Sequence, residues 1–145
     1  LVATCDLAVA EASTKFGVNG VNIGLFCSTP MVALSRNISR KQAFEMLTTG
    51  EFITADQAKT LGLVNRVASI DKFDAETEDL AEKIASKLGA AVKIGKEAFY
   101  KQLEMPITEA YEYTGQVMAE NMMLRQTEKG IDAFLNKLEP AWEQD

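Results

Sequence analysis

The period of apolar and polar positions changes several times within the first half of the chain. Short apolar runs at residues 7–10, 14–16 and 63–67 predict brief strands, with a turn between the first two. Between these runs, apolar positions recur at helical spacing, which predicts helices over residues 30–36, 40–49 and 55–61. The first half should therefore combine short strands with helices.

Capping side chains and glycines mark the ends of these predicted helices. Ser39 and Thr54 are each followed three residues later by glutamine, the capping-box pattern, and Thr29 precedes a proline suited to the first helical position. Gly50 and Gly62 stand where the second and third helices should end.

The second half shows only helical periodicity, so we place a boundary between subdomains near Ala68. The pattern predicts helices over residues 74–88, 90–103 and 109–124 and a last helix that ends before Pro140, the final two capped by Thr108 and Thr127. The helix at residues 109–124 is apolar around much of its circumference. Such a helix packs either in the core of its own chain or against another subunit, and the sequence alone favours neither.

The stretch from residue 16 to residue 36 is where a small-molecule site is expected, because it runs from a strand end through a glycine-rich loop into a helix. Gly17, Gly20 and Gly24 alternate with Asn19 and Asn22, a composition that allows a backbone to approach a ligand closely. The first-turn amides of the following helix point back into this loop, where a carbonyl or phosphate group would meet them. The alternative is that the glycines only form a tight crossing between layers.

Composition restricts the classes of partner. The chain has 145 residues, 47% of them hydrophobic and 25% charged, with a formal net charge of −6 and no run of lysine or arginine. Neither a nucleic acid nor an anionic membrane is therefore an expected partner, and a polyanionic cofactor would need local cations. We found no apolar stretch long enough to span a bilayer and no basic signal-peptide region. The sequence also does not begin with methionine, so we interpret Leu1 as an internal start.

The chain contains no histidine, which excludes histidine triads and zinc sites of the usual type. Acid–base work would fall to carboxylates, tyrosine, lysine or bound water. Cys5 and Cys27 are expected to be reduced rather than paired. Glu11, the carboxylate nearest the loop, is expected to be a solvated turn residue.

Two motifs together resemble the enoyl-CoA hydratase/isomerase (crotonase) family. The first is Lys-Phe followed by Gly-x-x-x-x-x-x-Gly and a helix with a late arginine, and the second is Thr-Gly-x-x-Ile-x-Ala-x-x-Ala-x-x-x-Gly-Leu-Val-Asn at residues 49–65. The resemblance implies an α/β fold, the C-terminal part of a crotonase-like ββα spiral, over residues 1–68. A helical subdomain that contacts coenzyme A and supports oligomerisation would follow at residues 69–145, leaving the chain mostly α by content.

The resemblance implies that the intact protein binds a fatty acyl or enoyl thioester of coenzyme A, in fatty-acid metabolism, and needs no other cofactor. The family's oxyanion-hole amides and first glutamate would lie upstream of Leu1, and its second glutamate falls on Gly20, so no residue of this chain is assigned a catalytic role. Either the missing half supplies the acid–base group, or the protein binds acyl-CoA without hydrating it. If the upstream half supplies an intact oxyanion hole, the parent should hydrate crotonyl-CoA very slowly and Gly20→Glu should recover part of that rate. Gly20, Gly24 and Phe26 are the predicted substrate-binding residues of the loop.

The end of the chain resembles the family's closing pattern Gly-x-x-Ala-Phe-x-x-Lys-Arg-x-Pro-x-Trp, which makes Phe134 and Lys137 predicted coenzyme A contacts. Leu138 replaces the usual arginine. The family resemblance also implies a homotrimer or hexamer in the cytoplasm or the mitochondrial matrix. Two alternatives remain open, a non-catalytic acyl-CoA-binding protein and a purely structural oligomerisation module.

Overall fold

The computed structural model describes residues 1–142 and divides the chain into two compact units, Leu1–Leu80 (unit 1) and Ala81–Asp145 (unit 2). This division falls inside helix α4, Phe73–Ala85. The boundary expected near Ala68 from composition stays a prediction.

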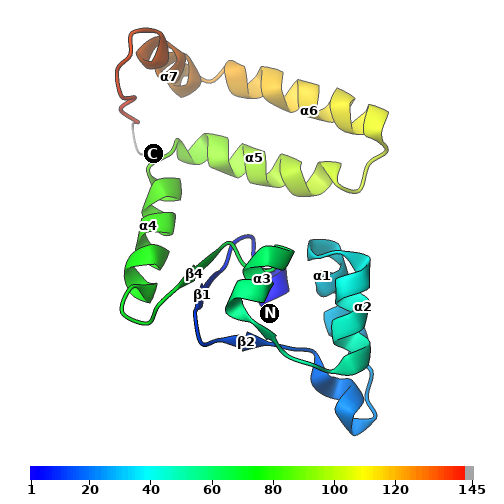
Figure 1. Cartoon of the computed structure of the whole chain (residues 1–145). Coiled ribbons are helices and arrows are strands. Elements are labelled where there is room, and N and C mark those ends of the chain that lie inside the picture. Colours follow the sequence, from blue (N-terminus) through cyan, green and yellow to red (C-terminus); the bar gives the residue numbers. More distant parts are fainter. Residues whose placement is uncertain (143–145) are drawn as a thin grey trace. The chain divides into compact units, whose positions relative to one another are not determined.

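Unit 1 combines short strands with helices (Figure 1), as the pattern predicts. In chain order its elements are the 3₁₀ helix η1 (Val2–Thr4), β1 (Val9–Glu11), β2 (Lys15–Phe16), the 3₁₀ helix η2 (Asn19–Ile23), α1 (Ser28–Asn37), α2 (Arg40–Thr49), β3 (Ile53–Thr54), α3 (Ala55–Leu61), β4 (Arg66–Ala68) and the first part of α4.

The strands form two separate pairs. β1 runs parallel to β4, with Ala10 opposite Val67, and β2 runs antiparallel to β3. Asn65 fixes the start of the parallel pair through two hydrogen bonds to Ala8. The side-chain Oδ1 of Asn65 accepts from the Ala8 backbone amide at 2.8 Å, and the backbone amide of Asn65 donates to the Ala8 carbonyl at 2.8 Å. The predicted strand at residues 63–67 begins later than expected, since the amides of Leu63 and Val64 donate to the Ala58 carbonyl at the end of α3.

Both expected capping positions at α2 and α3 are confirmed. The Thr54 hydroxyl accepts from the Gln57 amide at 3.2 Å, and Gln57 Oε1 accepts from the Thr54 amide at 2.8 Å, which completes a capping box. Ser39 accepts from the backbone amide of Gln42, which is half of that arrangement. Gly50 and Gly62 end their helices with φ of 65° and 83°.

Three other capping predictions are wrong by two or three positions. α1 begins at Ser28 after Cys27, α6 begins at Ile107 after Pro106, and α7 begins at Arg125 after Leu124. Thr29, Thr108 and Thr127 therefore lie inside first turns, where hydroxyl residues produce nearly the same sequence signal as at an N-cap.

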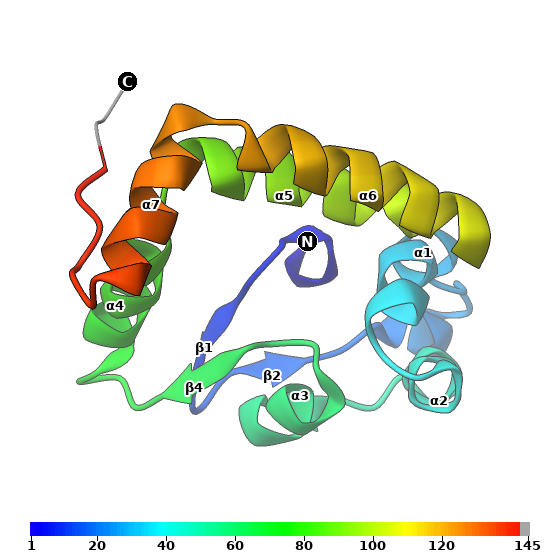
Figure 2. The same ribbon diagram turned by 90° about the horizontal axis from the view of Figure 1, so that it is seen from above.

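Unit 2 is helical and contains the last part of α4, followed by α5 (Gly89–Gln102), α6 (Ile107–Met122) and α7 (Arg125–Leu135). α5 and α6 lie side by side, as Figures 1 and 2 both show. Lys101 Nζ lies 4.4 Å from the centroid of the Tyr113 ring, joining these two helices. The prediction of a mostly helical α/β chain is confirmed. Within residues 1–142, no helix is both long and apolar enough to cross a membrane.

Thr54→Ala should lower the free energy of unfolding by about 1 kcal/mol, because it removes one half of the capping box at α3. Thr60→Ala in the same helix is the matched control. The Thr60 hydroxyl only donates back to the Asp56 carbonyl at 2.9 Å, an arrangement that adds little stability. Urea denaturation measures both variants, and equal midpoints for them would contradict the capping role.

Candidate functional site

The glycine-rich loop between β2 and α1 folds tightly upon itself around the carbonyl of Gly20. That carbonyl accepts from the Leu25 amide at 2.9 Å and from the Gly24 amide. Gly24 adopts φ of 79°, in the left-handed region that favours glycine. The structure therefore brings Gly20 and Gly24, two of the predicted substrate-binding residues, into one compact turn.

Gly20 itself is constrained by crowding. A Cβ atom at this position would lie 2.5 Å from the Leu25 carbonyl oxygen and 2.7 Å from Cys27 Sγ. The first of these atoms belongs to the backbone and cannot rotate away. A longer side chain would therefore force the loop to shift, and the expectation that Gly20→Glu recovers catalysis stays a prediction.

Asn22 has a structural role that the sequence did not reveal. Its Nδ2 donates to the Gly50 carbonyl at 3.3 Å, which ties the loop to the C-terminus of α2. Gly50 in turn must be small, since a Cβ there would lie 2.5 Å from Asn22 Oδ1. One N–H of the Asn22 side-chain amide is thus used to hold the loop against α2.

Phe26, the third predicted loop residue, lies just before α1. Its side chain is 41% exposed, and its carbonyl accepts from the Ser28 amide at 2.8 Å. Cys27 follows it and is a half-buried free thiol, whereas the free thiol of Cys5 is exposed.

An apolar cleft of about 520 Å³ opens beside this loop. Its walls come from η1, the end of β2, the start of the loop, and α1, with further contributions from the core: Leu1, Val2, Ala3, Thr4, Phe16, Gly17, Val18, Thr29, Pro30, Ala33, Leu34, Met46 and Leu63. Gly20, Gly24 and Phe26 are not among these residues. An apolar space beside the first turn of a helix suits a ligand with an apolar chain and a polar end.

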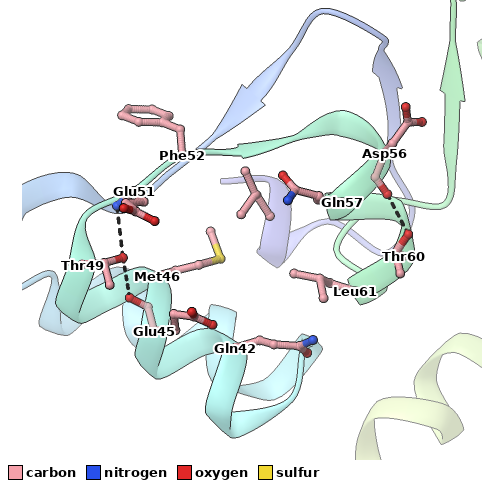
Figure 3. Close-up of a pocket in the computed structure, with 11 residues that line it drawn as sticks. Gln42, Glu45, Met46, Thr49, Glu51, Phe52, Asp56, Gln57, Thr60 and Leu61 are labelled. Carbon is pink, nitrogen blue, oxygen red and sulfur yellow. Dashed lines mark hydrogen bonds between the residues drawn. The ribbon is translucent and has the colours of Figure 1, made fainter.

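A second cavity of unit 1, about 430 Å³, lies between α2, β3 and α3 (Figure 3). Its hydroxyl groups are occupied, because Thr49 donates to the Glu45 carbonyl at 2.8 Å and Thr60 donates to the Asp56 carbonyl. Three of the side chains that line it are carboxylic acids, Glu45, Glu51 and Asp56. This surface would repel a polyanion such as coenzyme A.

Glu11 is unsuited to proton abstraction. Ser13 donates both its hydroxyl and its backbone amide to the Glu11 carboxylate, the amide at 3.0 Å. These hydrogen bonds stabilise the carboxylate and lower the pKa of Glu11, which makes it a weaker base. Within residues 1–142, no group of three or more histidine, cysteine, aspartate or glutamate side chains is arranged to hold a metal ion.

Phe134 and Lys137 lie together at the end of α7 in unit 2, and both are exposed. The Lys137 amide donates to the Phe134 carbonyl at 3.1 Å, and the Leu138 amide donates to the Ala133 carbonyl at 2.9 Å. This pair of bonds is a Schellman motif, which places Lys137 in the left-handed position with φ of 57°. Glycine is the usual residue there.

The enoyl-CoA hydratase/isomerase family model matches residues 1–145, the whole chain. The chain belongs to this family. It is 48% identical over 145 residues to human enoyl-CoA hydratase domain-containing protein 3, mitochondrial, covering 100% of this chain and 48% of that protein. The mouse protein of the same name is 46% identical over 142 residues, covering 98% of this chain and 47% of that protein. The chain therefore spans about half the length of these curated relatives.

Solved structures of the family establish the fold. A Mycobacterium smegmatis enoyl-CoA hydratase superposes with a TM-score of 0.95 at 55% identity, covering 99% of this chain and 56% of that one. The human enoyl-CoA hydratase domain-containing protein 3 superposes with a TM-score of 0.93 at 48% identity, covering 97% of this chain and 56% of that one. The predicted crotonase-type fold is confirmed. The roles of the individual site residues stay predictions.

Gly20→Ala should lower the free energy of unfolding by about 1–3 kcal/mol, because its methyl group would overlap the Leu25 carbonyl. Gly95→Ala is the control. It lies inside α5, and a Cβ there would meet nothing within 4 Å, so this variant should gain about 0.5–1 kcal/mol. Opposite signs in thermal or urea denaturation support the crowding at Gly20, whereas two gains would contradict it.

Lys137→Gly should raise the free energy of unfolding by about 1 kcal/mol, since glycine adopts the left-handed conformation without the clash of a Cβ atom. Lys137→Ala removes the charge but keeps the Cβ atom, and it should leave stability nearly unchanged. Denaturation midpoints compare the two variants. Destabilisation by Lys137→Gly would show that the motif is not strained.

Proposed function

We propose that this chain is an acyl-CoA-binding part of its protein, corresponding to the C-terminal part of the family's domain, and that it binds a fatty acyl or enoyl thioester without supplying an acid–base carboxylate. The packing at Gly20 is the observation that carries the proposal. Where the family resemblance places a glutamate, this chain has a glycine with a backbone carbonyl 2.5 Å from any added Cβ atom. Loss of a general acid–base group typically reduces a rate about 10²–10⁴-fold.

The apolar cleft beside α1 is the proposed site for the acyl chain. Phe16, Val18 and Ala33 line it, and each methylene group buried against such walls contributes about 0.8 kcal/mol. The first turn of α1 borders the same cleft and carries no acidic residue, so it does not repel the thioester end.

The coenzyme A phosphates require a cation, because the chain as a whole carries a net charge of −6. Lys137 is the proposed contact, supported by its place in the closing pattern and by its exposure at the end of α7. Leu138 next to it cannot share this task. The phosphate contact therefore depends on a single predicted cation.

Self-assembly into a trimer or hexamer is a second proposed property. Large apolar side chains on α6 remain exposed, among them Tyr111 at 74% and Met118 at 63%. Exposed apolar surface of this kind favours contact with another protein chain. The relatives whose names read mitochondrial support the mitochondrial matrix as the compartment.

Calorimetric titration with coenzyme A and with hexanoyl-CoA tests the acyl site. The chain should bind hexanoyl-CoA more tightly, and Ala33→Phe should remove that preference by filling the cleft. Val32→Phe is the control, since Val32 is exposed on the same helix and does not line the cleft. We expect the Ala33 variant to lose about five-fold or more in affinity for hexanoyl-CoA, or about 1 kcal/mol.

Crotonyl-CoA completes the test, because its double bond absorbs and is lost on hydration. The chain should bind crotonyl-CoA without consuming it. Steady consumption would contradict the absence of an acid–base group, and equal binding of hexanoyl-CoA by parent and Ala33→Phe would contradict the placement of the acyl chain.

A further inference from the structure

Lys137 has an unusual backbone for its residue type. Among residues 1–142 it is the only residue other than glycine with positive φ. Two other helices, α2 and α3, also end in the left-handed conformation, and they use Gly50 and Gly62. A lysine at the corresponding place in α7 carries conformational strain that persists only where neighbouring structure enforces it.

Gly130 is a second unfavourable residue in the same helix. It lies inside α7, where glycine disfavours helix formation relative to alanine. A Cβ atom at Gly130 would lie 2.7 Å from Cη2 and 3.1 Å from Cζ3 of Trp142. The glycine therefore allows the indole ring to lie directly on the helix surface.

Trp142 is half-buried and lies against α7. Besides contacting Gly130, it lines an apolar cavity with Leu88, Phe134 and Leu138. The chain between residues 138 and 142 thus leaves the Schellman motif, turns back and ends against the helix it came from. Its two ends are the Leu138–Ala133 hydrogen bond and the Trp142–Gly130 contact.

We infer that Gly130 and Trp142 are positioning residues for Lys137: the indole packed on Gly130 holds the turned-back tail, which keeps Lys137 in its left-handed conformation and directs its ammonium group to a coenzyme A phosphate. This inference rests on the proposed function, because it requires Lys137 to meet a phosphate. A lysine side chain has high rotamer entropy, which is lost when it binds an anion. If the backbone of Lys137 is already fixed, only the side chain must be ordered on binding.

Gly130→Ala tests the inference, because it improves helix propensity while displacing Trp142. Trp142 is the only tryptophan in the chain, so its fluorescence reports the contact directly. We expect a red-shifted emission and greater quenching by iodide. The affinity for coenzyme A at low ionic strength should fall about three- to five-fold, as in Lys137→Ala. The dependence of this affinity on salt concentration should also become weaker, by as much as in Lys137→Ala.

Three further variants make the result specific. Trp142→Ala removes the ring without a clash and should weaken coenzyme A binding as Gly130→Ala does, while Trp142→Phe should restore it. The double variant Gly130→Ala/Lys137→Ala should bind no more weakly than Lys137→Ala alone. Gly115→Ala is the control, since a Cβ there meets nothing within 4 Å, and it should change neither fluorescence nor affinity.

The outcomes separate this inference from the proposed function. If the parent does not bind coenzyme A, or if Lys137→Ala binds it as the parent does, the proposed phosphate contact fails. If Lys137→Ala weakens binding but Gly130→Ala displaces Trp142 with no loss of affinity, the positioning role alone is overturned. An unchanged Trp142 emission in Gly130→Ala would overturn the contact on which that role depends.

Discussion

The close packing of α3 is the constraint on which unit 1 depends. Ala55 and Ala58 are 0% exposed, so the helix lies against its neighbours with no space for a larger side chain. The Thr54 cap joins α3 directly to β3, and its end at Gly62 leads into Leu63, whose amide returns to the Ala58 carbonyl. A shift of α3 would therefore disturb both strand pairs, because β3 holds β2 and the residues after α3 set the register of β4.

That packing also supports the conformation of the glycine-rich loop. The loop is bonded to the end of α2 through Asn22 and Gly50, and α2 contributes Ala43, Met46 and Leu47 to the same buried core as α3. The loop is thus supported from the core rather than held only by its own turns. Such support helps to keep Gly20 close to the Leu25 carbonyl.

Sequence reasoning succeeded where one residue determines its own local structure. The Thr54 and Gln57 side chains each hydrogen-bond to the other residue's backbone. Gly62 adopts the left-handed conformation because it has no Cβ atom. A spacing of a few residues is therefore enough to predict both the start and the end of α3. It failed where a contact joins positions far apart in the chain. The bond between Asn22 and Gly50 and the contact between Gly130 and Trp142 leave no periodic signal, and the crowding at Gly20 arises from the path of the backbone after it.

The distribution of charge shows why the position of Lys137 matters for the proposed phosphate contact. In unit 1, the cavity between α2 and α3 has three carboxylic acids in its lining, whereas the cleft beside α1 has none. An acyl chain can use the uncharged cleft because apolar burial does not depend on net charge. Phosphates cannot avoid the excess negative charge of the whole chain in this way, so their recognition depends on a cation at a fixed place. A glycine at position 137 would relieve the backbone strain but would remove the cation of the proposed phosphate contact, and this proposed contact is the reason we offer for a lysine where a glycine would be more stable.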